Sequence, residues 1–170
     1  MKTIKLLVVI ILVIISAIIF SNCSNKKPNN EVAIGDNLTE TIKEAPVEIS
    51  LFNRLGGTEG ISLIVDDIAQ AHLNNPVINH VFLPLKENPE HFESFKTHVK
   101  EFLSAGTGGD AAYTGKDLPT AHKGLNTTEK EFLSAVDDIL MVLTKHNIDE
   151  ETKKDLLYIL YSMKGAVIGK

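Results

Sequence analysis

The sequence predicts an all-α fold in which several amphipathic helices form one small bundle. The main evidence is the spacing of apolar residues, which recur three, four and seven positions apart in long stretches after residue 49. Glycine pairs and prolines separate these stretches, as expected at helix ends. A hydrophobic content of 44% in a chain of 170 residues is enough to build one globular core.

The first two helices are predicted on either side of a glycine pair. A short helix from about residue 49 should end at Gly56-Gly57, and the hydroxyl of Thr58 can cap the helix that follows. That second helix is expected to run to about Asn74, where Asn75-Pro76 interrupts it. Its buried face is formed by Ile61, Ile64, Val65 and Ile68.

A helical corner is predicted over 77–82, and a loop over 83–90 should rim the pocket. The third long helix is expected to start near Pro89 and to end at the glycines of 106–109. One side of it carries Phe92, Phe95, Val99, Phe102 and Leu103. Phenylalanines at this spacing usually form a core, and here the same face can also be the wall of a cofactor pocket. His98 shares that side of the helix.

The last two helices are predicted after residue 126. Thr127 or Thr128 can cap the fourth helix, whose apolar face carries Phe132, Leu133, Val136, Ile139, Leu140 and Leu143. His146 stands next to Lys145 in its last turn, where the helix dipole favours positive charge, so we interpret it as an end-of-helix residue and not as a ligand. A final helix should begin at Ile148-Asp149, with Leu156, Leu160, Met163 and Val167 on one face.

The segment Tyr113–Leu125 sets one histidine between two long helical patterns. Gly115 frees the backbone, Pro119 suits the first turn of a helix, and Gly124 closes the single turn that holds Ala121-His122. A backbone so constrained aims the imidazole of His122. A histidine exposed at a helix end is the competing interpretation.

Four motifs together resemble the truncated haemoglobins of group I. They are Leu51–Gly57, Phe102–Gly109, Tyr113-Thr114-Gly115 and Ala121-His122, whose order and spacing agree with the family over roughly residues 50 to 168. The resemblance implies a two-over-two helical sandwich around haem b. It further implies that His122 is the proximal iron ligand, because haem iron takes a neutral imidazole on one face. The expected walls of the haem pocket are Phe92, Phe95, Val99, Phe102, Leu118, Phe132, Val136 and Leu140.

The sequence departs from the family on the gas-binding side. Ala69 stands where family members commonly carry a tyrosine, and Val99 stands where many carry a glutamine, with Phe95 one turn earlier. Two hydrogen-bond donors are thereby replaced with apolar groups. His98 falls where some group I members carry a histidine that binds the iron directly, and we weigh this role evenly against that of a propionate partner or a solvated edge residue.

The first 22 residues have the pattern of a signal peptide. Lys2 and Lys5 precede an apolar run from Leu6 to Phe20 that only Ser16 interrupts. Fifteen helical residues cover roughly 22 Å, less than the roughly 30 Å of a bilayer core, which favours a cleaved signal over an uncleaved anchor.

The segment Phe20-Ser21-Asn22-Cys23 resembles the lipobox of bacterial lipoproteins, although Phe20 and Asn22 depart from its usual residues. Cys23 is the only cysteine of the chain, and we predict that it carries lipid; a chance thiol is the alternative. The polar stretch 23–48 is then a tether with a reach of roughly 25 to 30 Å, and 49–170 is the globin domain.

The leading functional hypothesis is a haem protein that binds oxygen, nitric oxide or carbon monoxide at the bacterial cell envelope. The lipid would anchor it to a membrane, facing outside the cytoplasm, in the periplasm. A net charge of −5 without a basic cluster excludes nucleic acid as a partner. Nitric oxide dioxygenation would require an unknown reductase, and enzyme status stays open. The alternatives are a globin-fold lipoprotein that acts as an interaction module without haem, and a transient haem carrier.

Overall fold

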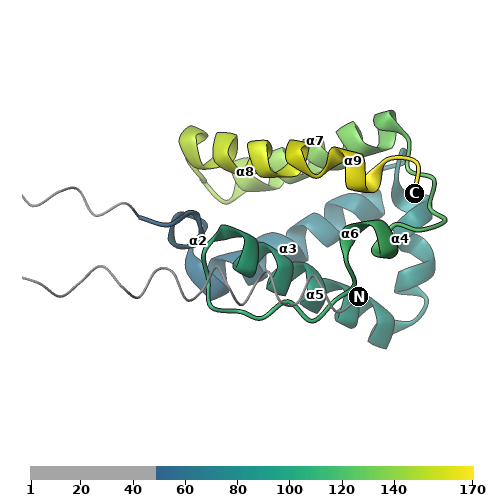
Figure 1. The fold of residues 1–170 in the computed structure, drawn as a ribbon, viewed down its shortest axis with the longest axis horizontal. Coiled ribbons are helices and arrows are strands. Elements are labelled where there is room, and N and C mark those ends of the chain that lie inside the picture. Colours follow the sequence, from purple (N-terminus) through teal and green to yellow (C-terminus); the bar gives the residue numbers. More distant parts are fainter. Residues whose placement is uncertain (1–48) are drawn as a thin grey trace, which may run out of the picture. The chain divides into compact units, whose positions relative to one another are not determined.

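A computed structural model of the chain describes residues 49–170 (Figure 1). All regular structure in this range is helical, and no strand occurs in it. The helices are α2 (Leu51–Arg54), α3 (Gly57–Asn74), α4 (Asn79–Lys86), α5 (Pro89–Thr107), α6 (Leu118–Ala121), α7 (Glu129–Lys145), α8 (Glu150–Ser162) and α9 (Lys164–Val167). The predicted signal peptide, the lipidated Cys23 and the tether lie outside the described residues.

The four long helices form two layers. Helix α3 packs against α5 in one layer and against α7 in the other, and α7 packs against α8. Figure 1 shows α7 and α8 together above α3 and α5. This arrangement confirms the predicted two-over-two helical sandwich. The segment between α5 and α6 contains no helix.

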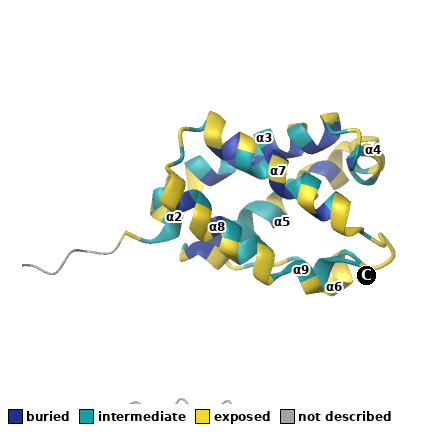
Figure 2. Cartoon of the chain, turned by 90° about the horizontal axis from the view of Figure 1, so that it is seen from above, coloured by how far each residue is buried: buried dark blue, intermediate teal, exposed yellow. Residues whose placement is uncertain are grey.

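The core lies where α3, α7 and α8 meet. In Figure 2 the long helices each carry buried positions on one side and exposed positions on another. The four α3 residues predicted to form a buried face are at most 9% exposed, and they pack with Leu55, Val142, Leu143 and Leu156. Leu143, which the apolar spacing placed on the buried face of the fourth helix, is 0% exposed and lies in the core.

The prediction that Thr58 caps the second helix is wrong. The N-cap of α3 is Gly56, with a φ of 87°, and Thr58 is already inside the helix. A left-handed φ is easily adopted only by glycine, so the first of the two glycines starts the helix two residues earlier than a threonine cap would. The Gly56 carbonyl accepts the first hydrogen bond, from the Gly60 N–H at 3.0 Å.

The loop predicted over 83–90 is largely helical. Helix α4 continues through Pro84 to Lys86, which leaves only Glu87 and Asn88 between helices. Pro84 cannot donate the hydrogen bond of its turn, and the helix ends two residues later. The Asn88 side chain then accepts hydrogen bonds from the backbone of Glu90 and His91, which starts α5 at Pro89 as predicted.

The final helix is interrupted at Met163, which separates α8 from α9. The four apolar residues predicted on its face nevertheless all line one cavity, which is described below. Of the two predicted caps of the fourth helix, Thr127 and Thr128, it is Thr128 that caps α7, in a reciprocal capping box with Glu131. His146 is the C-cap of α7, and its Nε2 lies 2.7 Å from Asp67 Oδ2 on α3.

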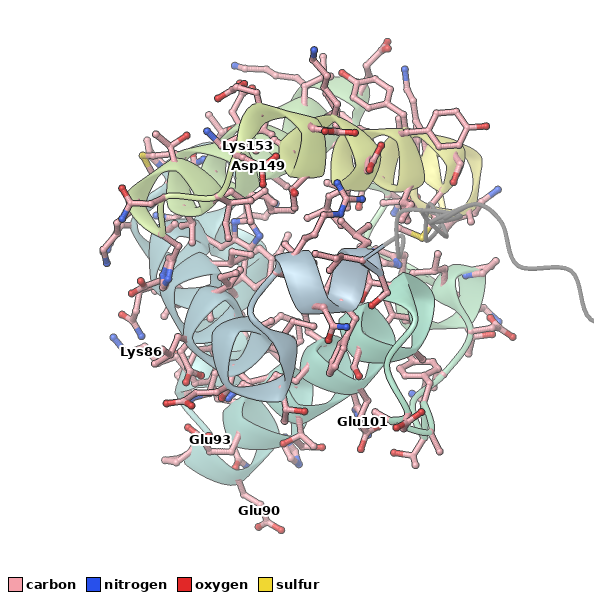
Figure 3. The ribbon with its side chains drawn as sticks, turned by 90° about the vertical axis from the view of Figure 1, so that its left-hand side faces the viewer. Lys86, Glu90, Glu93, Glu101, Asp149 and Lys153 are labelled. Carbon is pink, nitrogen blue, oxygen red and sulfur yellow. The ribbon has the colours of Figure 1, made fainter. Side chains whose placement is uncertain are left out.

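The outer faces of the helices carry charged side chains. In Figure 3, Glu90 projects outward from the start of α5, whereas Glu101, further along that helix, lies beside the segment that leads to α6. Glu101 accepts hydrogen bonds there from the backbone and the hydroxyl of Thr114. Within residues 49–170, no helix is long and apolar enough to cross a membrane.

Candidate functional site

An apolar cavity of about 490 Å³ lies between the two layers. Helices α3, α4 and α5 contribute one part of its wall, and α6, α7, α8 and α9 contribute the other. Six of the residues predicted to contact a cofactor line it, namely Phe95, Val99, Phe102, Leu118, Phe132 and Val136. His122 also lines it, so the structure brings the candidate ligand and most of the candidate wall together.

Phe92 and Leu140 do not line the cavity. Phe92 is 8% exposed and packs with Ala69 and Leu73 in a separate apolar cluster. On α7 it is Ile139 that faces the cavity; Leu140, about 100° further round the helix, packs against the main core. Both residues belong to the predicted apolar faces, but those faces are wider than the cavity.

His122 is fixed by the short helix before it. Asp117 caps α6 by accepting a hydrogen bond from the Thr120 N–H at 2.8 Å, and the His122 N–H bonds to the Leu118 carbonyl at 3.1 Å. The Nδ1 atom of His122 lies 2.8 Å from the same carbonyl oxygen. A carbonyl oxygen can only accept, so Nδ1 carries the hydrogen, and Nε2 of the neutral ring keeps its lone pair.

Tyr113 and Gly115 shape the approach to α6. The Tyr113 ring packs edge-on against Phe102, with centroids 5.2 Å apart, and its hydroxyl donates to the Lys116 carbonyl. Partial burial raises the pKa of this phenol, so the hydroxyl keeps its proton and remains a donor at neutral pH. A Cβ atom on Gly115 would lie 2.4 Å from that hydroxyl. Only glycine fits there, which explains the Tyr-x-Gly pattern in physical terms.

His98 does not line the cavity. It is half-buried on α5, and its ring lies edge-on to Tyr113 with a centroid separation of 6.5 Å. The α5 residues that do face the cavity include Phe95, Val99 and Phe102, so His98 stands at the flank of that face. The role of His98 as an iron ligand or as an edge residue stays a prediction.

The two departures from the family pattern lie on the cavity wall. Ala69, which is 2% exposed, and Val99 both line it. Neither side chain offers a hydrogen bond. The wall is therefore apolar at both of the positions where the resemblance places a donor in other members.

Sequence reasoning missed His72, which is 6% exposed and lines the cavity from α3. Its Nδ1 lies 2.9 Å from Asp138 Oδ2 on α7, and its ring stacks on Phe82 at 4.8 Å. Burial lowers the pKa of His72, and the hydrogen bond to Asp138 opposes that shift. The apolar spacing of α3 could have shown that residue 72 lies on the buried face, because it follows Val65 by seven positions and Ile68 by four.

The cavity does not resemble a site for a bare metal ion. Among residues 49–170, no three His, Cys, Asp or Glu side chains gather as metal ligands. An apolar cavity with an imidazole on a short, constrained segment, inside a two-over-two helical sandwich, is what the resemblance to the class of truncated haemoglobins implies.

Comparison of the chain with known proteins agrees with this class. No family model matches the sequence. The chain is 29% identical over 108 residues to the group 1 truncated hemoglobin GlbN of Synechocystis, an alignment that covers 60% of this chain and 82% of the relative. It is 27% identical over 121 residues to the group 1 truncated hemoglobin LI410 of Chlamydomonas moewusii, covering 70% and 68% of the two chains.

Solved structures show the same fold. The truncated hemoglobin of Tetrahymena pyriformis superposes with a TM-score of 0.65 at 20% identity, covering 72% of this chain and all of the other. The hemoglobin of Chloroflexus aurantiacus gives a TM-score of 0.61, also at 20% identity and with the same coverage. The chain therefore has the two-over-two globin fold, and its sequence is similar to those of group 1 truncated hemoglobins.

Proposed function

We propose that the chain binds haem b in the cavity through His122 and takes up a diatomic gas, with oxygen and nitric oxide as the main ligands. The observation that carries this proposal is the 2.8 Å hydrogen bond from His122 Nδ1 to the Leu118 carbonyl. A histidine that ligates a metal usually donates its other N–H in this way. The bond leaves Nε2 available, in the tautomer that haem iron requires.

The cavity also fits the shape and chemistry of haem. Its volume of about 490 Å³ lies within the range of roughly 300 to 1,000 Å³ that is typical of cofactor sites. Phe95, Phe102 and Phe132 supply flat apolar surface against which a porphyrin can pack. When bound, the haem supplies an iron centre with one open position for a gas.

The chain's own residues determine how that position behaves. Oxygen bound to haem is retained by hydrogen-bond donors aimed at it, each contributing about 1 to 2 kcal/mol. Ala69 and Val99 supply none. We therefore expect oxygen to leave quickly, and nitric oxide and carbon monoxide, which depend less on donors, to be favoured relative to it.

Replacing His122 with glycine tests the proposal. The full chain loaded with hemin should show a strong Soret band, and His122→Gly should bind hemin weakly and recover a five-coordinate spectrum with added imidazole. The control is His91→Gly, which removes an exposed histidine from α5 and should change nothing. A colourless wild-type protein would overturn the proposal, and an unaltered spectrum in His122→Gly would assign the iron to another histidine.

We further propose that lipid on Cys23 anchors the domain at the cell envelope, facing outside the cytoplasm. The support is the sequence alone, in which an apolar run ends at the only cysteine. In a bacterial host the wild-type chain should partition into detergent and incorporate labelled fatty acid, and Cys23→Ser should do neither. Unchanged partition and labelling in Cys23→Ser would rule the anchor out.

Transient haem carriage is a second candidate, and one observation favours it. Among the described residues that line the cavity, none is a lysine or an arginine, and Glu131 is an acid. The propionates of haem would meet no cation in this wall, which weakens retention. Transfer of hemin to apomyoglobin measures this directly: loss within minutes favours carriage, and retention over hours favours gas binding.

A further inference from the structure

His72 is a buried histidine whose side chain lines the cavity. It is 6% exposed, and its Nε2 has no hydrogen-bond partner among the described residues. His72 lines the cavity and its Nδ1 atom is held by Asp138, so we infer that Nε2 is the ring nitrogen open to the cavity.

The surroundings of His72 determine which ring nitrogen carries the hydrogen. Asn75 Oδ1 accepts a hydrogen bond from the Val77 N–H at 3.0 Å, which orients the amide so that Nδ2 faces Asp138. From there the two hydrogens of Nδ2 are shared among Ser134 Oγ at 2.9 Å and the two Asp138 oxygens at 3.0 and 2.9 Å. The oxygens of a carboxylate only accept hydrogen bonds, so His72 Nδ1 is the donor in the 2.9 Å bond to Asp138 Oδ2.

We propose that His72, oriented by Asp138, is a hydrogen-bond acceptor on the cavity wall and selects small ligands that carry an O–H or S–H proton. With the hydrogen on Nδ1, the Nε2 atom of a neutral ring presents a lone pair. Oxygen, nitric oxide and carbon monoxide have no proton to donate to it, whereas water, hydrogen sulfide and hydrosulfide do. The inference rests on the proposed function, since it names the class of ligand that the haem cavity favours.

Two further features support an acceptor. Burial lowers the pKa of His72, which keeps the ring neutral near pH 7. The other titratable groups around the cavity are His122, whose Nδ1–H is already donated to Leu118, and Glu131, which is engaged in the capping box of α7. In an apolar cavity a hydrogen bond to this lone pair is stronger than in bulk water, because the local dielectric constant is lower.

The state of the ring can be read without haem. In the full chain labelled with ¹⁵N and free of haem, ring nitrogen spectra should show His72 with a protonated Nδ1 and an unprotonated Nε2 near pH 7. His72→Asn identifies the signal, because asparagine keeps a donor toward Asp138 but has no Nε2. A protonated Nε2 in the wild type would overturn the proposal.

The ligand preference is tested on the full chain loaded with hemin. His72→Leu should weaken hydrosulfide binding to the ferric form about tenfold, the effect of one hydrogen bond, and should change carbon monoxide binding to the ferrous form less than about threefold. His91→Leu, an exposed histidine on α5, is the matched control and should change neither. His72→Asn should reproduce the selective loss if His72→Leu folds poorly.

The failures can be told apart. Equal changes for both ligands, or no change for hydrosulfide, would overturn the proposal and leave haem binding intact. A wild-type chain that takes up no hemin would instead overturn the proposed function, and the ligand preference with it. The ring nitrogen spectra would still decide whether His72 is an acceptor.

Discussion

Replacing Val99 with glutamine should slow oxygen release from the haem-loaded protein about tenfold. Val99 is half-buried and lines the cavity from α5, one turn after Phe95 and one turn before Leu103. A glutamine amide at this position extends into the cavity and supplies the donor that the wild-type wall lacks there. The reference is Val99→Leu, which adds a similar reach without a polar group.

The size of the effect follows from one hydrogen bond in a water-poor cavity. A net contribution of about 1.4 kcal/mol corresponds to a factor of ten in the release rate. The amide also has a cost, because without a ligand it is partly desolvated and unpartnered, and the free protein should lose about 1 to 2 kcal/mol of stability. Tyrosine at Ala69 is a poorer test, because that position is 2% exposed and would be overpacked.

Stopped-flow measurement of oxygen displacement from the ferrous protein gives the rate. Carbon monoxide dissociation should change less than about twofold in Val99→Gln, because carbon monoxide gains little from a donor. Val99→Leu should release oxygen at about the wild-type rate. If Val99→Gln and Val99→Leu released oxygen equally fast, the side chain at 99 would not reach the gas, and the reasoning about the apolar wall would be refuted.

Two other substitutions test the surroundings of the cavity. His98→Ala should leave the ferric spectrum unchanged because the ring lies against Tyr113 and off the cavity; a change from low spin to high spin would make His98 an iron ligand. Asp67 is held by Lys145 and by His146, which lower the pKa of its carboxyl, so its contribution to stability is present above the ordinary value of about 3.9 and is lost as pH falls through the lowered pKa. Asp67→Asn should therefore cost about 0.5 to 1 kcal/mol in urea unfolding at pH 6 and clearly less at pH 2; an equal cost at both would contradict the ion-pair explanation.

The fold was largely predictable because its helices bury strongly periodic apolar faces. The spacing of Ile61, Ile64, Val65 and Ile68 placed α3, and Thr128 with Glu131 placed the start of α7. The errors arose where local rules compete. Gly56 starts its helix without a side-chain cap, and Pro84 lies inside α4, where it removes one backbone hydrogen bond without ending the helix.

The candidate site was predictable only in part. The position of His122 followed from the proline and glycine around it, which constrain one turn of backbone. The orientation of its ring depends on a hydrogen bond to the Leu118 carbonyl, which the sequence alone does not show. His72 was missed because its partner Asp138 lies 66 residues later, and pairing between distant helices is not visible in local periodicity.

Ala69, which stands where family members commonly carry a tyrosine, and His72 are neighbours on the cavity-facing side of α3. Both residues line the cavity from α3, and positions three apart on a helix are neighbours on its surface, with Cβ atoms roughly 5 to 6 Å apart. A larger side chain at 69 would take up part of the cavity beside His72, and alanine leaves that space open. The cavity thus combines apolar side chains at 69 and 99 with the His72 ring, which Asp138 orients. We propose that this combination favours a ligand with an O–H or S–H proton to donate.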